Sequence, residues 1–240
     1  MKKFWEIKNK GNKEGELLIY SEISSDSWWG DETTPKKFKE DLDNLGEIDT
    51  LNIYINSPGG DVFAGVAIYN MLKRHKANKV VYIDGLAASI ASVIAMAGDT
   101  IIMPRNAMIM IHKAWTFVGG NADDMRKMAE NLDNIDVAIS GSYERTGLNN
   151  EEILALMKSE TWLTADEAIE KGFADELEVE KEIAACIGSD FFNRYKNVPE
   201  ILIKNEENAE ILVKDEKKPD MTGLLAVYEQ KIKLNKRRNL

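Results

Sequence analysis

The stretch of sequence that decides the fold runs from residue 51 to residue 60 and reads LNIYINSPGG. Apolar and polar residues alternate in its first half, Leu51 to Ile55, which predicts a β-strand with one buried face. A proline and two glycines then break the strand in the segment Asn56 to Gly60. Residues 61–75 carry apolar side chains at helical spacing, so a helix is predicted directly after the turn.

A second strand, turn and helix follow further along the chain. Val80 to Ile83 is an apolar strand, the segment GLAAS occupies residues 85–89, and a helix of small residues continues to about Gly98. The alternation of strands and helices over residues 48–180 indicates an α/β fold. Ligands of such folds bind at the carboxyl ends of the strands, where the glycines and helix starts of this chain lie. Two short strands are predicted next, at residues 100–103 and 107–111.

Other elements are predicted on both sides of this region. A strand over residues 16–23 comes first, and Thr34-Pro35 is typical of a helix start, with threonine as N-cap and proline in the first turn. A helix over residues 165–171 begins with a capping-box pattern and ends at Gly172. One more short helix is predicted, at residues 151–158.

The longest predicted helix starts after Gly119-Gly120-Asn121 and reaches about Arg145. Its apolar residues recur every three or four positions and form a narrow stripe. Such a stripe packs either against another helix or against the core of its own domain, and spacing alone does not distinguish the two. The stripe consists of Met125, Met128, Leu132, Ile135 and Ile139.

Composition excludes several classes of protein. The chain has 240 residues and a formal net charge of −10, which argues against nucleic acid as the main partner because phosphate binding needs clustered Lys and Arg. The longest apolar stretch, residues 86–98, is too short to span a bilayer, and the amino terminus lacks a secretory apolar region. Cys186 is the single cysteine, so no internal disulfide is expected and a buried thiol in a cytoplasmic protein is predicted.

The last part of the sequence differs in character from the rest. Residues 193–220 are polar, mixed in charge and contain two prolines, and residues 231–238 are basic. A segment of this composition buries little apolar surface. We predict one domain over residues 1–190 and a polar linker with a peripheral tail over residues 191–240.

Several residues match the requirements of a serine nucleophile, which are a base, donors for the oxyanion and a group that orients the base. Ser89 follows a strand and opens a helix, as a nucleophile or an ordinary N-cap does. His112 ends a strand, where it serves either as a base or as a structural histidine, whereas His75 ends a basic helix and is expected to be a solvated charge. Gly59-Gly60 forms either an oxyanion hole or a simple turn, and no phosphate-binding glycine motif is present.

Three blocks of sequence resemble the signature blocks of the Clp protease proteolytic-subunit family. These are NSPGG at residues 56–60, GLAAS at 85–89 and MIMIH at 108–112, and two further matches are Gly119-Gly120 before the long helix and LTADEAIEKG at 163–172. The resemblance covers about residues 48–178, and the order and spacing of the blocks are specific. It implies the α/β Clp protease/crotonase-like fold of repeated β-β-α units, with a long helix for ring contacts. It also implies a serine endopeptidase that needs no cofactor and no metal.

The resemblance assigns roles residue by residue. Ser89 matches the nucleophile, His112 the general base, and the N–H groups of Gly60 and Ile90 the oxyanion hole. Glu160 stands at the position of the family's acidic residue, directly before the run TWLTA, although the family usually has Asp there. Asp136 on the long helix is the alternative third member.

Two departures from the cellular members indicate a branch of the family. The first 45 residues do not resemble the axial loops that face an ATPase partner, and the tail after about residue 190 is extra. Both features resemble Clp-like peptidases of tailed phages and prophages, which process scaffold and capsid proteins during head maturation. The expected protein is then a homo-oligomeric ring in the host cytoplasm that binds neither nucleic acid nor membrane, and the need for an ATPase partner stays open.

Three alternatives remain at this point. The first is the housekeeping Clp subunit that degrades unfolded proteins together with an ATPase ring. The second is a crotonase-like acyl-CoA enzyme, which shares the fold and the paired N–H groups but does not need Ser89 and His112 together. The third is an inactive assembly protein that keeps the fold for ring formation.

Overall fold

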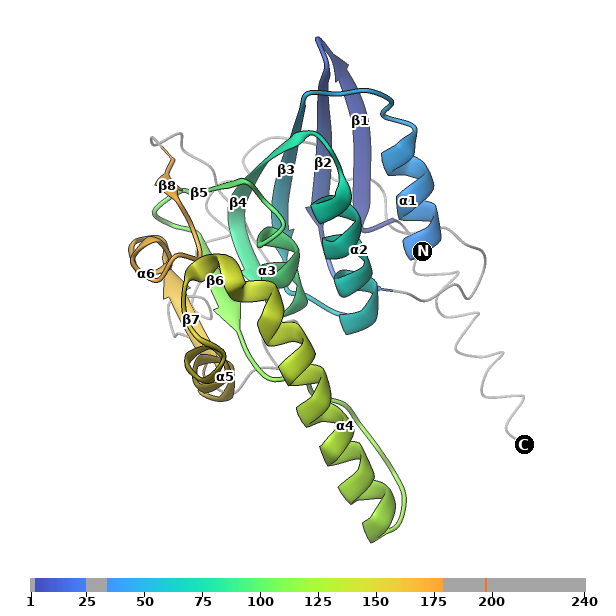
Figure 1. Cartoon of the computed structure of the whole chain (residues 1–240), viewed down its shortest axis with the longest axis vertical. Coiled ribbons are helices and arrows are strands. Elements are labelled where there is room, and N and C mark those ends of the chain that lie inside the picture. Colours follow the sequence, from blue (N-terminus) through green and yellow to red (C-terminus); the bar gives the residue numbers. More distant parts are fainter. Residues whose placement is uncertain (1–2, 25–33, 179–196, 198–240) are drawn as a thin grey trace, which may run out of the picture. The chain divides into compact units, whose positions relative to one another are not determined.

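The computed structural model describes residues 3–24, 34–178 and 197 (Figure 1). All of them belong to one compact unit, Met1–Pro199. Apart from Asn197, the predicted tail over residues 191–240 lies outside the described residues, as does Cys186. The boundary at residue 190 therefore stays a prediction.

The described strands form one eight-stranded sheet with the main order β1-β2-β3-β4-β5-β8. β1 and β2 form an antiparallel hairpin. From β2 onward the strands of this order are parallel to one another, namely β2, β3, β4, β5 and β8. β6 pairs parallel with β4 and antiparallel with β7. The bounds are β1 Trp5–Gly11, β2 Glu14–Tyr20, β3 Thr50–Ser57, β4 Asn78–Ala88, β5 Thr100–Met103, β6 Met108–Ile111, β7 Thr161–Thr164 and β8 Glu176–Leu177.

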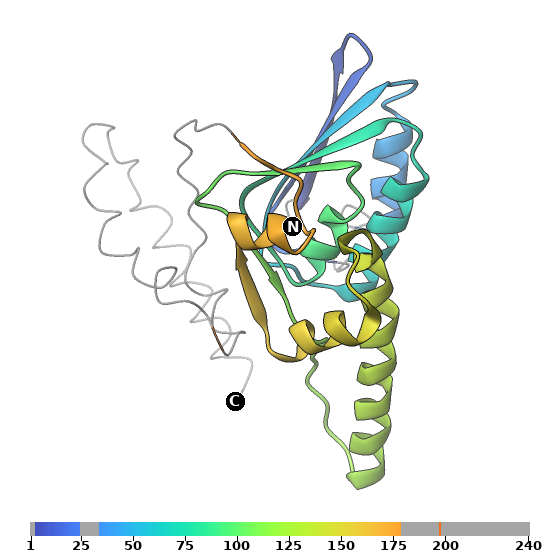
Figure 2. The ribbon, with the colours of Figure 1, turned by 60° about the vertical axis from the view of Figure 1, so that its left-hand side comes forward.

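The helices α1, α2 and α3 lie on one face of this sheet (Figures 1 and 2). Every second residue of β3 is buried, as the alternating sequence predicts, and these side chains join Phe38, Leu72 and Ile94 of the three helices in one core. α1 starts as predicted, with Thr34 as N-cap and proline in the first turn. The described helices are α1 Pro35–Asp43, α2 Val62–Arg74, α3 Ile90–Ala95, α4 Ala122–Ser140, the 3-10 helix η2 Gly141–Thr146, α5 Asn150–Lys158 and α6 Ala165–Glu170.

Strand β4 has two successive partners on the same edge. Its residues Val80–Tyr82 pair with β5, and its residues Leu86–Ala88 pair with β6. β4 is therefore longer than the predicted strand over residues 80–83, and it continues through the segment GLAAS up to Ser89. Because β3, β4 and β6 are parallel neighbours, their carboxyl ends meet at one edge of the sheet.

Helix α4 points away from the rest of the described chain at its amino-terminal end (Figures 1 and 2). Along the predicted apolar stripe, Met125 is 39% exposed, Ile135 packs against the core and Ile139 is buried. The carboxyl-terminal end of the stripe is therefore core, whereas its amino-terminal end is not covered by the described residues. The helix is also shorter than predicted, because the chain continues from Ser140 as the 3-10 helix η2.

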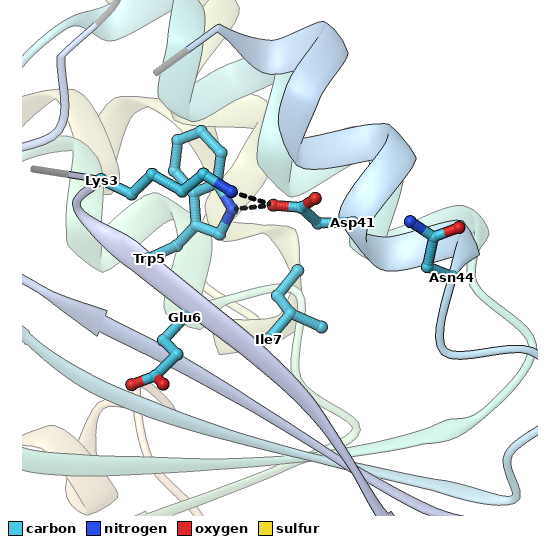
Figure 3. Close-up of a pocket in the computed structure, with 6 residues that line it drawn as sticks. All are labelled: Lys3, Trp5, Glu6, Ile7, Asp41 and Asn44. Carbon is cyan, nitrogen blue, oxygen red and sulfur yellow. Dashed lines mark hydrogen bonds and ion pairs between the residues drawn. The ribbon is translucent and has the colours of Figure 1, made fainter. Parts of the chain in front are cut away.

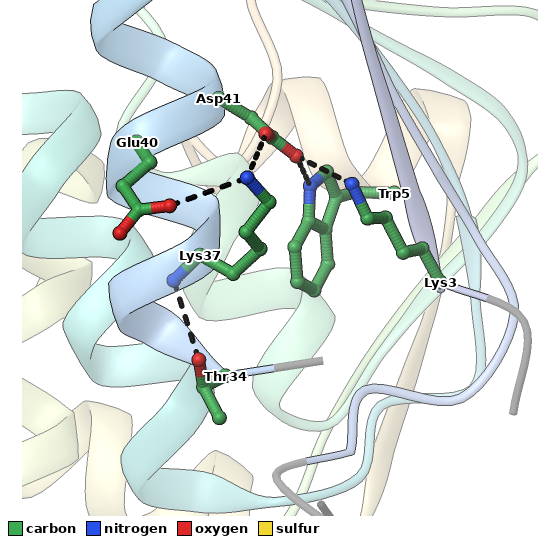
Figure 4. Close-up of polar contacts among 6 residues, drawn as sticks. All are labelled: Lys3, Trp5, Thr34, Lys37, Glu40 and Asp41. Atoms are coloured by element: carbon green, nitrogen blue, oxygen red, sulfur yellow. Dashed lines mark hydrogen bonds and ion pairs between the residues drawn. The ribbon is translucent and has the colours of Figure 1, made fainter. Parts of the chain in front are cut away.

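Strand β1 was not predicted, because its sequence is largely polar. It is held by the hairpin with β2 and by Asp41 of α1, whose carboxylate accepts hydrogen bonds from Lys3 Nζ at 2.9 Å and Trp5 Nε1 at 3.0 Å (Figures 3 and 4). Burial acts to raise the pKa of Asp41, but hydrogen bonds from Lys3, Trp5 and Lys37 outweigh it and hold the pKa below its usual value. A pocket of about 290 Å³ opens between β1 and α1, lined by none of the predicted site residues (Figure 3).

Candidate active site

The predicted site residues gather where β3, β4 and β6 end. Gly59 and Gly60 follow β3, Ser89 follows β4 and His112 follows β6. Parallel strands bring these positions to one edge of the sheet, which is where α/β folds bind ligands.

Ser89 and His112 lie in hydrogen-bond contact. His112 Nε2 is 2.8 Å from Ser89 Oγ, within the reach that a general base requires. The Ser89 side chain makes no N-cap hydrogen bond to α3, so the ordinary N-cap interpretation does not apply. The backbone of Ser89 has φ 54° and ψ −129°, a conformation that costs free energy for a residue other than glycine and is typical of functional sites.

Three hydrogen bonds hold the Ser89 backbone in this conformation. Its N–H donates to the Met110 carbonyl at 2.8 Å, and its carbonyl accepts from Ser92 Oγ at 2.5 Å and from the Ser92 N–H at 3.0 Å. Ser92 Oγ also lies 2.8 Å from Tyr143 Oη. Because the only hydroxyl proton of Ser92 goes to Ser89, Tyr143 must be the donor to Ser92. Burial raises the pKa of Tyr143, which keeps this hydroxyl protonated as a donor.

Gly59, the neighbour of Gly60, lies directly beside Ser89 and Ile90. Gly59 has φ +92°, and a Cβ there would lie 2.7 Å from Ser89 Cβ and 3.2 Å from Ile90 N. Ile90 is the first residue of α3, so its N–H has no acceptor within the helix. The backbone of Ile23 makes hydrogen bonds to the residues on both sides of Gly60. The Ile23 N–H donates to the Gly59 carbonyl at 2.8 Å, and the Ile23 carbonyl accepts the Asp61 N–H at 2.8 Å. These two bonds do not use the N–H of Gly60.

Glu160 lies at the same end of the β6–β7 ladder as His112. β6 and β7 are antiparallel and their last pair is Ile111 with Thr161, so His112 and Glu160 are the next residues beyond the ladder on the two strands. Glu160 has φ 48°, another positive value for a residue other than glycine, and its Oε1 accepts a hydrogen bond from Asn197 N–H at 2.7 Å.

Asp136, the alternative acid, is buried on α4 with 2% of its surface exposed. Its Oδ1 accepts a hydrogen bond from Ala114 N–H at 2.7 Å, and its Oδ2 lies 3.1 Å from Lys113 Nζ. Burial lowers the pKa of His112, while the carboxylates of Glu160 and then Asp136 act to raise it. Both carboxylates therefore act on the imidazole, and Glu160 has the larger effect.

Comparison with known proteins assigns this chain to a family. Residues 37–181, more than half of the chain, match the Clp protease family. The chain belongs to the Clp protease family. As a member of this family it is a serine-type peptidase. Its mixed α/β architecture of one sheet and packed helices is consistent with the Clp protease fold. Clp proteases act on protein substrates and form oligomeric rings.

Curated relatives cover most of the described region of this Clp protease. It is 32% identical over 140 residues to the ATP-dependent Clp protease proteolytic subunit of Deinococcus radiodurans, which is 57% of this chain and 68% of that protein. It is 35% identical over 133 residues to proteolytic subunit 2 of Tropheryma whipplei, 53% of this chain and 73% of that protein. It is 31% identical over 144 residues to the subunit of Bacteroides fragilis, 58% of this chain and 69% of that protein.

One feature outside the site of this Clp protease and one within it were not predicted. His75 is half-buried rather than a solvated charge: its Nδ1 accepts the Ala77 N–H at 3.2 Å, and burial lowers its pKa. The contacts of Ser92 and Tyr143 with Ser89 were not predicted either, and the only indication in the sequence was the spacing of three between Ser89 and Ser92.

The described ranges were also searched for metal sites and membrane spans. Within residues 3–24 and 34–178, no group of three His, Cys, Asp or Glu side chains is arranged to hold a metal ion. None of the helices in these ranges combines the length and apolarity that crossing a bilayer requires.

Replacing Gly59 by alanine is expected to lower kcat/KM by about 100-fold or more, because displacing reacting groups by about 1 Å has an effect of that size. The new Cβ would lie 2.7 Å from Ser89 Cβ and 2.8 Å from the Ala88 carbonyl, so the nucleophile must shift. Gly46→Ala is a matched control, since Gly46 also has a positive φ, +69°, but no atom within 4 Å of the added Cβ. Peptide hydrolysis and melting temperature are measured for both variants, and equal activities would contradict the prediction.

Proposed function

We propose that this chain hydrolyses peptide bonds with Ser89 as nucleophile, His112 as general base and Glu160 as the acid that orients the base. The observation that carries the proposal is the 2.8 Å contact between His112 Nε2 and Ser89 Oγ. Ser89 Oγ attacks the peptide carbonyl carbon while its proton passes to His112 Nε2, and the imidazolium then protonates the leaving amine. A water molecule, deprotonated by His112, hydrolyses the acyl-enzyme in the same way.

The N–H groups of Gly60 and Ile90 are proposed to stabilise the negative oxygen of the tetrahedral intermediate. This role is supported by the close approach of Gly59 to Ser89 and Ile90 N, and by the start of α3 at Ile90. The role of Glu160 is supported by its place next to the last β6–β7 pair, at the same end of the ladder as His112, and by its effect on the pKa of His112.

The rate of peptide hydrolysis is expected to rise with pH through a midpoint below about 6.5, the ordinary pKa of histidine. Burial lowers the pKa of His112, and only a neutral imidazole accepts the Ser89 proton. The rising part of the pH profile is measured as kcat/KM of a fluorogenic peptide against pH. In Glu160→Gln a negative charge that raises this pKa is lost, so the midpoint should move to a lower pH. A midpoint above 6.5, or an upward shift in Glu160→Gln, would contradict the assignment of His112.

The natural substrate is proposed to be a phage scaffold or capsid protein processed during head maturation. The family match ends at residue 181 and starts at residue 37, so both ends of the chain lie outside the part shared with the family. The alternative is a housekeeping subunit that works with an ATPase in the cytoplasm, and the names of the curated relatives favour it equally.

One experiment separates these two substrates. The purified protein is incubated with the capsid and scaffold proteins encoded beside its gene and, separately, with an unfolded protein plus a Clp ATPase of the same host and ATP. Defined cleavage of a capsid or scaffold protein without ATP supports head maturation. ATP-dependent degradation of the unfolded protein, with the capsid protein left intact, supports the housekeeping role instead. Ser89→Ala serves as the control for contaminating peptidases in both arms.

We also propose that the chain assembles into a ring through α4, which would enclose the active sites. The amino-terminal half of α4 extends from the described chain (Figure 1). It carries the end of the apolar stripe where Met125 is exposed and Met128 is half-buried. An apolar stripe that its own domain does not cover is typical of a contact between subunits.

Met128→Lys is expected to dissociate the assembly into smaller species while the domain stays folded. The new charge would lie within the proposed apolar contact, whereas the core contacts of Ile135 and Ile139 are unchanged. Asn134→Lys is the matched control, because it adds the same charge at an exposed position of the same helix. Light scattering at micromolar concentration measures the mass. A wild-type monomer, or equal masses for both variants, would refute the role of the stripe.

A further inference from the structure

Asp136 is a buried carboxylate whose partners lie next to the proposed general base. A carboxylate with 2% of its surface exposed is costly unless it is paired and hydrogen-bonded. Its Oδ1 accepts the Ala114 N–H at 2.7 Å, and its Oδ2 pairs with Lys113 Nζ at 3.1 Å. Both partners belong to the two residues that directly follow His112.

The segment after His112 is held by two helices. Asp136 of α4 binds the N–H of Ala114, and the carbonyl of Met157 in α5 accepts the Lys113 N–H at 3.2 Å. His112 is the first residue beyond β6, so the ladder with β4 and β7 no longer fixes it. The contacts at Lys113 and Ala114 therefore limit how far the imidazole moves away from Ser89.

The hydrogen bond to Ala114 is the important contact of Asp136. The Lys113 side chain is 40% exposed and is shared with Asp133, which is 72% exposed, so solvent and a second carboxylate weaken the hold of its ammonium group on Asp136. Lys113 also borders an open pocket of about 370 Å³ between α4 and α5, where water competes for its ammonium group. The bond to Ala114 joins a buried oxygen to the main chain, so its loss would leave a polar group without a partner.

The same stretch of chain also holds the nucleophile. η2 follows α4 directly, and its Tyr143 donates to Ser92, which donates to the Ser89 carbonyl. Asp136 and Tyr143 thus connect the two reacting side chains to one continuous segment. If the contact of Asp136 is lost, the hydrogen bond from Ser92 still holds Ser89. Of the two hydrogen bonds that hold the segment after His112, only the one from Lys113 N–H to Met157 then remains.

We propose that Asp136 is a positioning residue, which fixes His112 against Ser89 by accepting the Ala114 N–H, and that it is not the third member of the triad. This proposal rests on the proposed roles of Ser89 and His112. Asp136 uses one oxygen for the main chain and the other for Lys113, whereas Glu160 directly precedes β7 at the end of the ladder where His112 follows β6.

The test compares the kinetics of four variants in the full-length assembled protein. Asp136→Asn keeps an oxygen that accepts the Ala114 N–H, so kcat should stay within about five-fold of the wild type. Asp136→Leu has nearly the same shape but no acceptor, and kcat should fall about 10-fold to 100-fold with KM within about two-fold. Asp133→Asn removes the same charge one turn away and should leave both constants unchanged. Glu160→Gln should lower kcat more than Asp136→Asn does.

All values of kcat are expressed per active site titrated with a fluorophosphonate, so a partly unfolded preparation does not imitate a catalytic defect. A wild-type kcat per titrated site in Asp136→Leu would show a purely structural role and overturn the proposal. A loss in Asp136→Asn as large as in Asp136→Leu, with Glu160→Gln silent, would make Asp136 the acid and also overturn it. Should Asp136→Leu not fold, Asp136→Ala is measured in its place. An active Ser89→Ala enzyme would instead refute the proposed function itself.

Discussion

Ser89→Ala is expected to abolish peptide hydrolysis and to leave the fold intact. The change removes only Oγ, which lies 2.8 Å from His112 Nε2 and caps no backbone group of α3. Loss of a nucleophile of this type lowers kcat by about ten-thousand-fold to a million-fold, and the small remaining rate comes from the oxyanion hole and substrate binding. The rate is measured with a fluorogenic peptide, and the fold by thermal melting.

Ser159→Ala is the matched control for this variant. Ser159 is exposed at the end of α5, so the same chemical change there should alter neither the rate nor the melting temperature. Ser89→Ala activity near that of the control would show that another residue attacks the substrate. A large fall in the melting temperature of Ser89→Ala would show that Oγ supports the structure, and the kinetic loss could then not be assigned to chemistry.

Local patterns in the sequence were sufficient to predict that β3 and β4 precede the site, although not the full length of β4. β3 alternates with period two and is followed by a proline and two glycines, whereas β4 continues beyond the predicted strand over residues 80–83 up to Ser89. Because these signals are local, they place Gly60, Ser89 and His112 at strand ends without any knowledge of the tertiary structure. The parallel pairing of β4 with β6 then brings Ser89 and His112 to the same end of the sheet, where they make the 2.8 Å contact.

Elements that depend on tertiary contacts could not be predicted in this way. β1 is polar and is held by its hairpin and by Asp41, and β7 has only four residues, Thr161–Thr164. The pairing of β7 with β6 is what brings Glu160 to the same end of the sheet as His112, so only the resemblance to a family pointed to Glu160. The positive φ values of Ser89 and Glu160 also oppose local preference, as is common where a fold serves a functional site.

His112→Ala is expected to be about as damaging as Ser89→Ala. Without the imidazole, the described residues offer Ser89 Oγ no other side chain at hydrogen-bond distance to take its proton, so the hydroxyl remains a poor nucleophile. Burial keeps the pKa of His112 below its ordinary value, so the ring is neutral and competent at neutral pH before it is removed. His75→Ala is the control, because His75 caps α2 and lines neither of the described pockets.

The double variant Ser89→Ala/His112→Ala tests whether the two residues act as one unit. Once Ser89 is gone there is no hydroxyl for His112 to deprotonate, so removing the ring as well should change kcat by less than about ten-fold. Independent contributions would instead multiply, and the double variant would then lose the product of the two single losses. Comparing kcat of the wild type, both single variants and the double variant distinguishes these outcomes. A multiplicative loss would mean that the hydrogen bond between His112 and Ser89 is not the one through which the proton moves.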